Sequence, residues 1–138
     1  MDNLAATFSI ANSALKAQSQ RIRTATENLA NADSTGKTPG ANPYTRKVIT
    51  FESQLDDTTG ASLVAANGEE LDTSPYRIEK IPGHPAADKN GNVKLPNVNM
   101  LIELADIREG TTSYDASVQV VKQARELVTM TLDLLKAS

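Results

Sequence analysis

The sequence contains no cysteine and no tryptophan, and aromatic residues make up only 4% of it. Without cysteine the chain can form neither a disulfide framework nor a thiolate site, although this absence is compatible with any cellular compartment. The apolar fraction of 39% must therefore be largely aliphatic and alanine-rich. Such a composition favours helix-on-helix packing over a deep ligand pocket, and we expect no cofactor and no metal site.

The chain also lacks an excess of positive charge and a long apolar run. Its net charge of −3 gives no electrostatic basis for binding nucleic acid or an anionic membrane surface. No window approaches the roughly 18 apolar residues of a membrane span, so direct membrane insertion is not expected. The stretch Met1–Leu4 has no basic or apolar signal region, which predicts that no secretory signal is cleaved.

The longest helical pattern covers residues 99–138. Proline is absent from Met100 to Lys136, and only Gly110 argues against a helix. Asn99 is a good N-cap, and Glu103 suits the positive end of the helix. Apolar side chains step by three or four residues along one seam that Arg125 interrupts: Tyr114, Val118, Val121, Val128, Leu132 and Leu135. Beside it lies a second apolar row: Val120, Ala124, Leu127 and Leu134. This amphipathic helix cannot bury its own face and needs a partner.

A second helix is predicted from about Leu4 to Ala32. Its apolar positions repeat as heptads, with Gln18 as the polar exception: Leu4, Phe8, Ala11, Leu15, Ile22, Ala25, Leu29 and Ala32. Several of these positions are alanine, which permits close approach of a partner helix. The obvious partner is the C-terminal helix.

The middle of the chain is rich in turn residues and short β-type stretches. We predict strands at 44–51, 75–81 and 93–96, with a further short strand at 63–66. Asn67-Gly68 is read as a turn, and Asn90-Gly91 as a two-residue hairpin loop. The predicted fold is mostly α with a small β insert, and the long terminal helices pack as an antiparallel coiled-coil-like pair. We expect a single domain over 1–138, made of an N-terminal helix (1–35), a loop and β-rich insert (36–98) and a C-terminal helix (99–138).

Motifs that could carry chemistry have simpler structural readings. Gly36-Lys37-Thr38 resembles the end of a phosphate-binding loop, but Asn31 stands where that motif needs glycine, and a helix precedes it. The one histidine, His84, has no metal-ligand spacing and is expected to bond nearby backbone in a turn. The adjacent acids Asp56-Asp57 and Glu69-Glu70 are read as solvated.

Three stretches resemble the axial proteins of the bacterial flagellum. They are Ala17–Arg23 with Glu27–Gly36; Pro82–Asp88 with Asn90-Gly91 and Val93–Asn99; and Asp106–Glu109 with Ser113–Ala116 and Leu132–Leu135. The first and third are shared by many rod and hook proteins, whereas the second is similar to one proximal-rod type in particular. Two departures are local: Gly110 stands where the family usually has alanine, and Asp115-Ala116-Ser117 replaces Glu-Ala-Asn.

The resemblance implies a non-enzymatic structural subunit of the periplasmic rod, which assembles helically into the drive shaft and part of the export channel. It implies passage through the flagellar type III export apparatus without cleavage. The implied partners are further copies of the chain, other proximal and distal rod proteins, the rod–export-gate adaptor and the MS-ring protein.

Residue roles follow from the seams and the family motifs together. Inter-subunit packing is expected from Leu15, Ile22, Leu29, Val121, Val128, Leu132 and Leu135. The family-signature turns are Asn28, Asn31, Asp33, Gly83, His84, Pro85, Pro96 and Asn97. Asn28, Asn31 and Asp33 are expected to shape the turn out of the first helix.

Periodicity alone does not show whether the apolar seams pack within one molecule or between molecules. They fit the core of a closed hairpin within one molecule, and they equally fit half of an intermolecular interface. An autonomous helical-hairpin adaptor is therefore the alternative function. A small hydrolase is a further rival, but it would need a cleft with converging polar groups that the sequence does not indicate.

Overall fold

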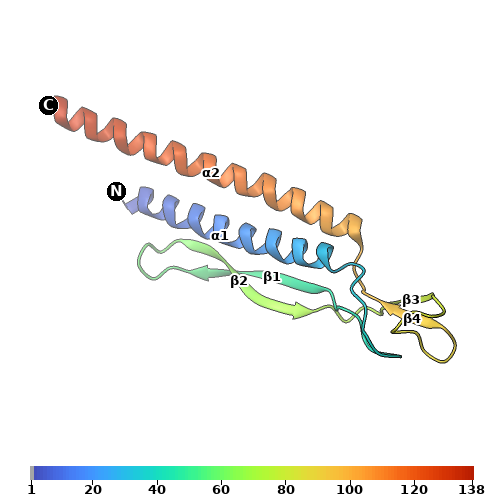
Figure 1. The fold of residues 1–138 in the computed structure, drawn as a ribbon. Coiled ribbons are helices and arrows are strands. Elements are labelled where there is room, and N and C mark those ends of the chain that lie inside the picture. Colours follow the sequence, from blue (N-terminus) through green and yellow to red (C-terminus); the bar gives the residue numbers. More distant parts are fainter. Residues whose placement is uncertain (1) are drawn as a thin grey trace.

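The computed structural model describes residues 2–138 and has two long helices that lie side by side and run antiparallel (Figure 1). Helix α1 (Asp2–Ala30) has 29 residues and helix α2 (Met100–Ala137) has 38. Because α1 ends beside the start of α2, the longer α2 projects beyond the N-terminal end of α1 (Figure 1). Asn99 is the N-cap of α2, as predicted, and its side chain accepts a hydrogen bond from the backbone N–H of Leu101.

The strands form two separate antiparallel pairs. β1 (Lys47–Leu55) pairs with β2 (Ser62–Leu71), and β3 (Arg77–Lys80) pairs with β4 (Asn92–Leu95). The long β1–β2 hairpin runs along α1 on a different face from α2, while β3–β4 lies near the chain connections at the far end (Figure 1). Helix α1 is therefore the central element, and the predicted fold class is confirmed.

The predicted turn at Asn67-Gly68 is wrong, because both residues lie inside β2. The β1–β2 register shifts between Ile49 and Phe51. Asn67 and Gly68 of β2 therefore face the single β1 residue between them, Thr50, in a β-bulge. Gly68 has a φ of +85°, a left-handed conformation that glycine adopts without strain. The same Asn-Gly signal thus serves a bulge here, and it cannot by itself distinguish a bulge from a turn.

The predicted two-residue hairpin loop at Asn90-Gly91 is also wrong. Residues 81–91 connect β3 to β4, and the dipeptide only closes this longer loop. Ile81 donates its backbone N–H to the carbonyl oxygen of Gly91, and Asp88 accepts from the backbone of Asn90 and Asn92. These bonds hold a compact loop that the local dipeptide signal did not indicate.

Strand bounds also differ from the predictions. β1 starts at Lys47 rather than residue 44, because the backbone N–H groups of Tyr44 and Arg46 bond to Ser34 and to the Asn97 side chain instead of a neighbouring strand. β2 extends to Leu71, well past the predicted 63–66. It continues because the bulge preserves pairing, with Lys47 opposite Leu71.

Small residues bring α1 and α2 close together. Gly110 is buried in the middle of α2, and the helix continues through it without interruption. A Cβ atom added at this position would lie 2.9 Å from Cγ1 of Ile22 in α1. The glycine that the sequence marks as a weak point of the helix is thus a point of close approach, where Ile22 packs against bare backbone.

This contact predicts that the effect of Gly110→Ala depends on residue 22. Alanine at a glycine position within a helix normally stabilises by about 0.5–1 kcal/mol. In the unaltered chain we expect that gain to be cancelled or reversed, since the new methyl group meets Ile22. In an Ile22→Ala background the gain should appear in full. Urea unfolding of the unaltered chain, the two single variants and the double variant measures both effects. Equal effects of Gly110→Ala in the two backgrounds would show that the new methyl group does not meet Ile22.

Candidate functional site

The C-terminal end of α2 exposes a broad apolar surface. We call residues 125–138 the α2 overhang, because this segment includes the end of α2 that projects beyond α1 (Figure 1). Five large apolar side chains here have 50% to 73% of their surface exposed: Leu127, Met130, Leu132, Leu134 and Leu135. At about 100° per residue they share one wide face, whereas Thr129, Asp133 and Lys136 lie on the opposite one. An exposed apolar face of this kind is a candidate interaction surface.

The seven predicted packing residues fall into two groups. Leu132 and Leu135 are exposed in the overhang. Half-buried positions are occupied by Leu15, Ile22, Leu29, Val121 and Val128. Ile22 packs on Gly110 of its own chain, so this residue takes part in an intramolecular contact. The inter-subunit role of all seven stays a prediction, and Leu132 and Leu135 are its most accessible members.

The stripe of α2 that faces α1 is displaced from the predicted seam. Its buried positions are Glu103, Gly110 and Ala124, and Ser117 lines an apolar groove between the helices. Tyr114, which was assigned to the seam, is exposed. Periodicity identifies rows of large apolar side chains, whereas two helices in close contact bury their small ones. The large side chains are thereby left beside or outside the contact.

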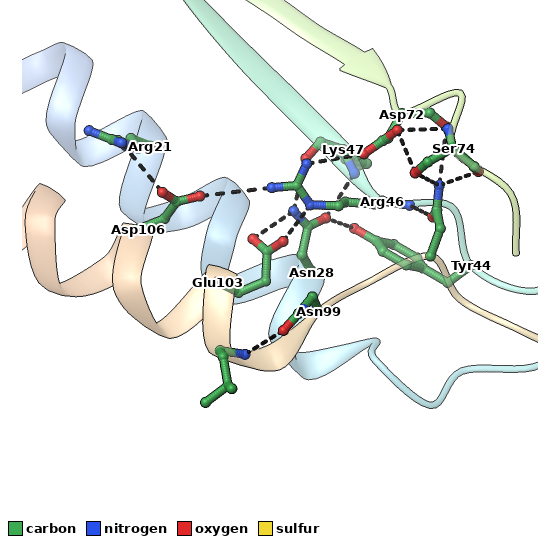
Figure 2. A network of polar contacts seen from close by, with 12 residues as sticks. Arg21, Asn28, Tyr44, Arg46, Lys47, Asp72, Ser74, Asn99, Glu103 and Asp106 are labelled. Carbon is green, nitrogen blue, oxygen red and sulfur yellow. Dashed lines mark hydrogen bonds and ion pairs between the residues drawn. The ribbon is translucent and has the colours of Figure 1, made fainter. Parts of the chain in front are cut away.

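A buried polar junction joins the helices to the middle segment at the other end of the molecule (Figure 2). Asn28 is 1% exposed, and its side chain makes four hydrogen bonds. Its Oδ1 accepts from the Tyr44 hydroxyl at 2.8 Å and from the Lys47 N–H at 2.9 Å. Its Nδ2 donates to the Lys47 carbonyl oxygen at 2.8 Å and to Glu103 Oε2 at 3.1 Å. The full capacity of the amide is used.

Glu103 is the charged centre of this junction. Only 1% of its surface is exposed, and Arg46 Nε donates to its second carboxylate oxygen, Oε1. Arg46 also pairs with Asp72 at 3.1 Å, and more distantly with Asp106 at 3.8 Å. The sequence predicted Glu103 only as a favourable charge at the helix start, so its burial and its partner were missed.

Asn97 ties the segment before α2 to the end of the β1–β2 hairpin. Its Oδ1 accepts from the Arg46 N–H at 2.8 Å. Its Nδ2 donates to the carbonyl oxygens of Asp72 and Ser74, at 3.2 and 3.0 Å. The segments that leave α1, enter and leave the hairpin, and enter α2 therefore meet in one place (Figure 2).

The other signature residues lie in turns around this junction. Asn31, just after α1, donates to the Glu27 carbonyl oxygen in the last turn of that helix, while Asp33 is largely exposed and lies 3.9 Å from Arg77. His84 Nδ1 accepts from the Ala86 N–H at 3.0 Å, the backbone bond expected from the sequence. The remaining three are Gly83, with a φ of +84°, Pro85, and Pro96, which is fully buried.

Carboxyl groups around the junction are held in their charged form. The Thr24 hydroxyl donates to Glu69 at 2.7 Å, and this bond, with the nearby charge of Lys47, lowers the pKa of Glu69. Hydrogen bonds from the Ser74 N–H and hydroxyl, and then Arg46, lower the pKa of Asp72. Glu69, predicted to be simply solvated, thus bonds directly to α1.

Neither helix in residues 2–138 is long and apolar enough to cross a membrane. Over the same residues, no group of three or more histidine or acidic side chains is placed to hold a metal ion. The features that stand out are a helix pair braced by a polar junction and an exposed apolar overhang. These features are those of a structural protein, and the exposed overhang is its candidate contact surface.

Comparison with known proteins gives the particular family. A family model described as "Flagella basal body rod protein" matches residues 8–36. The flagellar basal-body rod protein FlgC of Agrobacterium fabrum is 54% identical over 138 residues, covering 100% of this chain and 99% of that protein. FlgC of Salmonella typhimurium is 39% identical over 130 residues, covering 92% and 94%. FlgC of Borreliella burgdorferi is 30% identical over 151 aligned positions, covering 96% and 98%. The chain belongs to the FlgC family of flagellar basal-body rod proteins.

Proposed function

We propose that the chain is a structural subunit of the proximal rod of the flagellar basal body. Its copies and their neighbours pack through α1 and α2 into a helical tube, which transmits motor torque and encloses part of the export channel. The observation that carries this proposal is the α2 overhang, whose leucines are exposed in the single chain. Contacts that join different surfaces of successive subunits and do not close into a ring generate such a helix.

Family membership supports a set of partners and a location for this subunit. The partners are further copies of the chain, other proximal and distal rod proteins, the rod–export-gate adaptor and the MS-ring protein. The location is the periplasmic rod, reached through the flagellar type III export apparatus without cleavage of a signal peptide. In this role the chain needs no catalytic group and no cofactor.

Leu132→Asp tests the role of the overhang. The substitution places a charge on the exposed apolar face, so we expect loss of motility in a strain that carries only this variant. The purified subunit should keep its circular dichroism spectrum and its unfolding midpoint, since residue 132 is exposed. Substitutions at exposed positions usually change stability by about 0.5 kcal/mol or less.

Thr129→Asp is the matched control, because Thr129 lies in the same overhang on its polar face. This chain should remain motile. Global unfolding of the Leu132→Asp subunit would favour the autonomous hairpin adaptor, in which the overhang belongs to an internal core. Normal motility with Leu132→Asp would remove the overhang from the assembly interface.

A further inference from the structure

The packing between α1 and α2 does not by itself select one lengthwise alignment. Gly110, Ser117 and Ala124 follow one another at intervals of seven residues along the stripe that faces α1. Sliding the helices by one interval, about 10 Å at about 1.5 Å per residue, would again bring a small residue opposite the same part of α1. The α1 side offers small residues too, with Ala11 and Ala14 in the shared groove. Repetition of this kind leaves the register weakly specified.

The polar atom in the middle of this contact does not resolve the ambiguity. Gln18 Oε1 is buried near Gly110 and has no hydrogen-bond partner among the described residues. A shift of the helices therefore breaks no hydrogen bond at this atom. The contact between Ile22 and Gly110 favours the observed alignment, but serine at 117 would offer Ile22 another small residue one interval away.

Glu103 continues the same seven-residue spacing, one interval before Gly110, but it is a buried carboxylate. One of its oxygens is bonded from α1 by Asn28, and the other from the start of the hairpin by Arg46. Asn28 is in turn fixed by both backbone groups of Lys47. Moving α2 by one interval would take Glu103 away from both donors. That leaves a buried charge and a buried amide group unpaired, which is costly.

We propose that Asn28, Arg46 and Glu103 form a register lock, which selects one lengthwise alignment of α2 on α1. The lock thereby sets how far the overhang projects beyond α1. A buried polar group that fixes helix register at some cost in stability is a known device in coiled coils. The register itself does not depend on the proposed function, whereas its value for assembly rests on it.

Distances between two spin labels can test the lock, because the chain has no cysteine of its own. Lys16→Cys in α1 and Gln123→Cys in α2 place labels at exposed positions that are offset along the helix pair. Labelled chains are diluted with unlabelled ones so that only distances within a chain contribute. We expect a single narrow distance peak for the otherwise unaltered chain.

The informative variant combines Asn28→Leu, Arg46→Met and Glu103→Leu. Apolar replacement of a complete buried ionic group is often neutral or stabilising, so we expect this chain to stay helical. Its distance distribution should gain a second peak, from a register displaced by about 10 Å along the axis. The matched control is Arg21→Met with Glu109→Leu, which removes a more exposed ion pair of 3.2 Å between the same helices and changes no partner of Arg46. The control should keep one peak.

A single unchanged peak in the triple variant would show that side-chain packing sets the register, and it would overturn the proposal. A second peak of equal size in the control would also overturn it, since any ion pair would then serve. So would a broad distribution in the unaltered chain. If the triple variant unfolds, Glu103→Leu, which removes both acceptor oxygens, decides in the same way: a second peak supports the lock, and a single narrow peak rejects it.

Discussion

Replacing Arg46 by methionine is expected to lower the free energy of unfolding by about 3–5 kcal/mol, because it leaves the buried Glu103 carboxylate without its cation. Methionine keeps much of the length of the side chain but cannot donate a hydrogen bond. Since Glu103 is 1% exposed, water cannot replace the lost donor without opening the junction. A loss of this size is a large fraction of the roughly 5–15 kcal/mol of a typical domain. Chemical unfolding at neutral pH, followed by circular dichroism, measures it.

Arg77→Met is the matched control. Arg77 also has two acidic neighbours, Asp33 at 3.9 Å and Glu79 at 3.8 Å, but its side chain is 49% exposed. Solvent screens such pairs, so we expect a loss of about 1 kcal/mol or less. Adding Glu103→Leu to Arg46→Met should restore most of the stability, because no charge is then buried. Similar losses for Arg46→Met and Arg77→Met would show that the Arg46 pair is no more important than a surface pair.

The two helices and their pairing could be predicted from sequence because their signals are local. Proline is absent over long stretches, apolar residues recur every three or four positions, and Asn99 supplies an N-cap. Strand existence was also readable from β-branched residues. Strand register was not, because the bulge at Asn67-Gly68 depends on how β1 and β2 align, and no residue of β2 alone records that alignment.

The junction could not be predicted because its members are far apart in sequence. Asn28 and Glu103 are separated by 75 residues, and Arg46 and Glu103 by 57. The family signature drew attention to Asn28 and Asn97, but only as turn residues. Arg46 lay unnoticed within a predicted strand. One signal was available: Glu103 continues the seven-residue spacing of Gly110, Ser117 and Ala124, which places a carboxylate on the face that α2 buries.

For the overhang, the residues could be identified from the sequence, but their exposure could not. The sequence identified its leucines as one apolar face, yet periodicity could not say whether that face was covered within the chain. The answer depends on the difference in length between α1 and α2, and on where their antiparallel alignment begins. Register and exposure are thus linked, since sliding α2 along α1 would change how many of these leucines project.

Asn28→Asp is expected to cost at least about 3 kcal/mol, although it replaces one atom by another of nearly the same size. The aspartate can still accept from Tyr44 and from the Lys47 N–H. It cannot donate, so its second oxygen would face the Lys47 carbonyl oxygen and the Glu103 carboxylate, which now receive hydrogen bonds from Nδ2. A buried charge would thus oppose another buried charge. Thermal and chemical unfolding at neutral pH measure the loss.

Asn31→Asp provides the comparison for the same chemical change just after the end of α1. The Asn31 amide is half-buried and donates only to the Glu27 carbonyl oxygen, so its replacement should cost about 1 kcal/mol. Adding Glu103→Gln to Asn28→Asp returns an amide donor between the two positions and should recover part of the loss. Recovery would identify the hydrogen bond between residues 28 and 103 as the origin of the effect. If the double variant is as unstable as Asn28→Asp alone, the loss arises instead at the Lys47 carbonyl oxygen, and Asn28 holds the hairpin rather than α2.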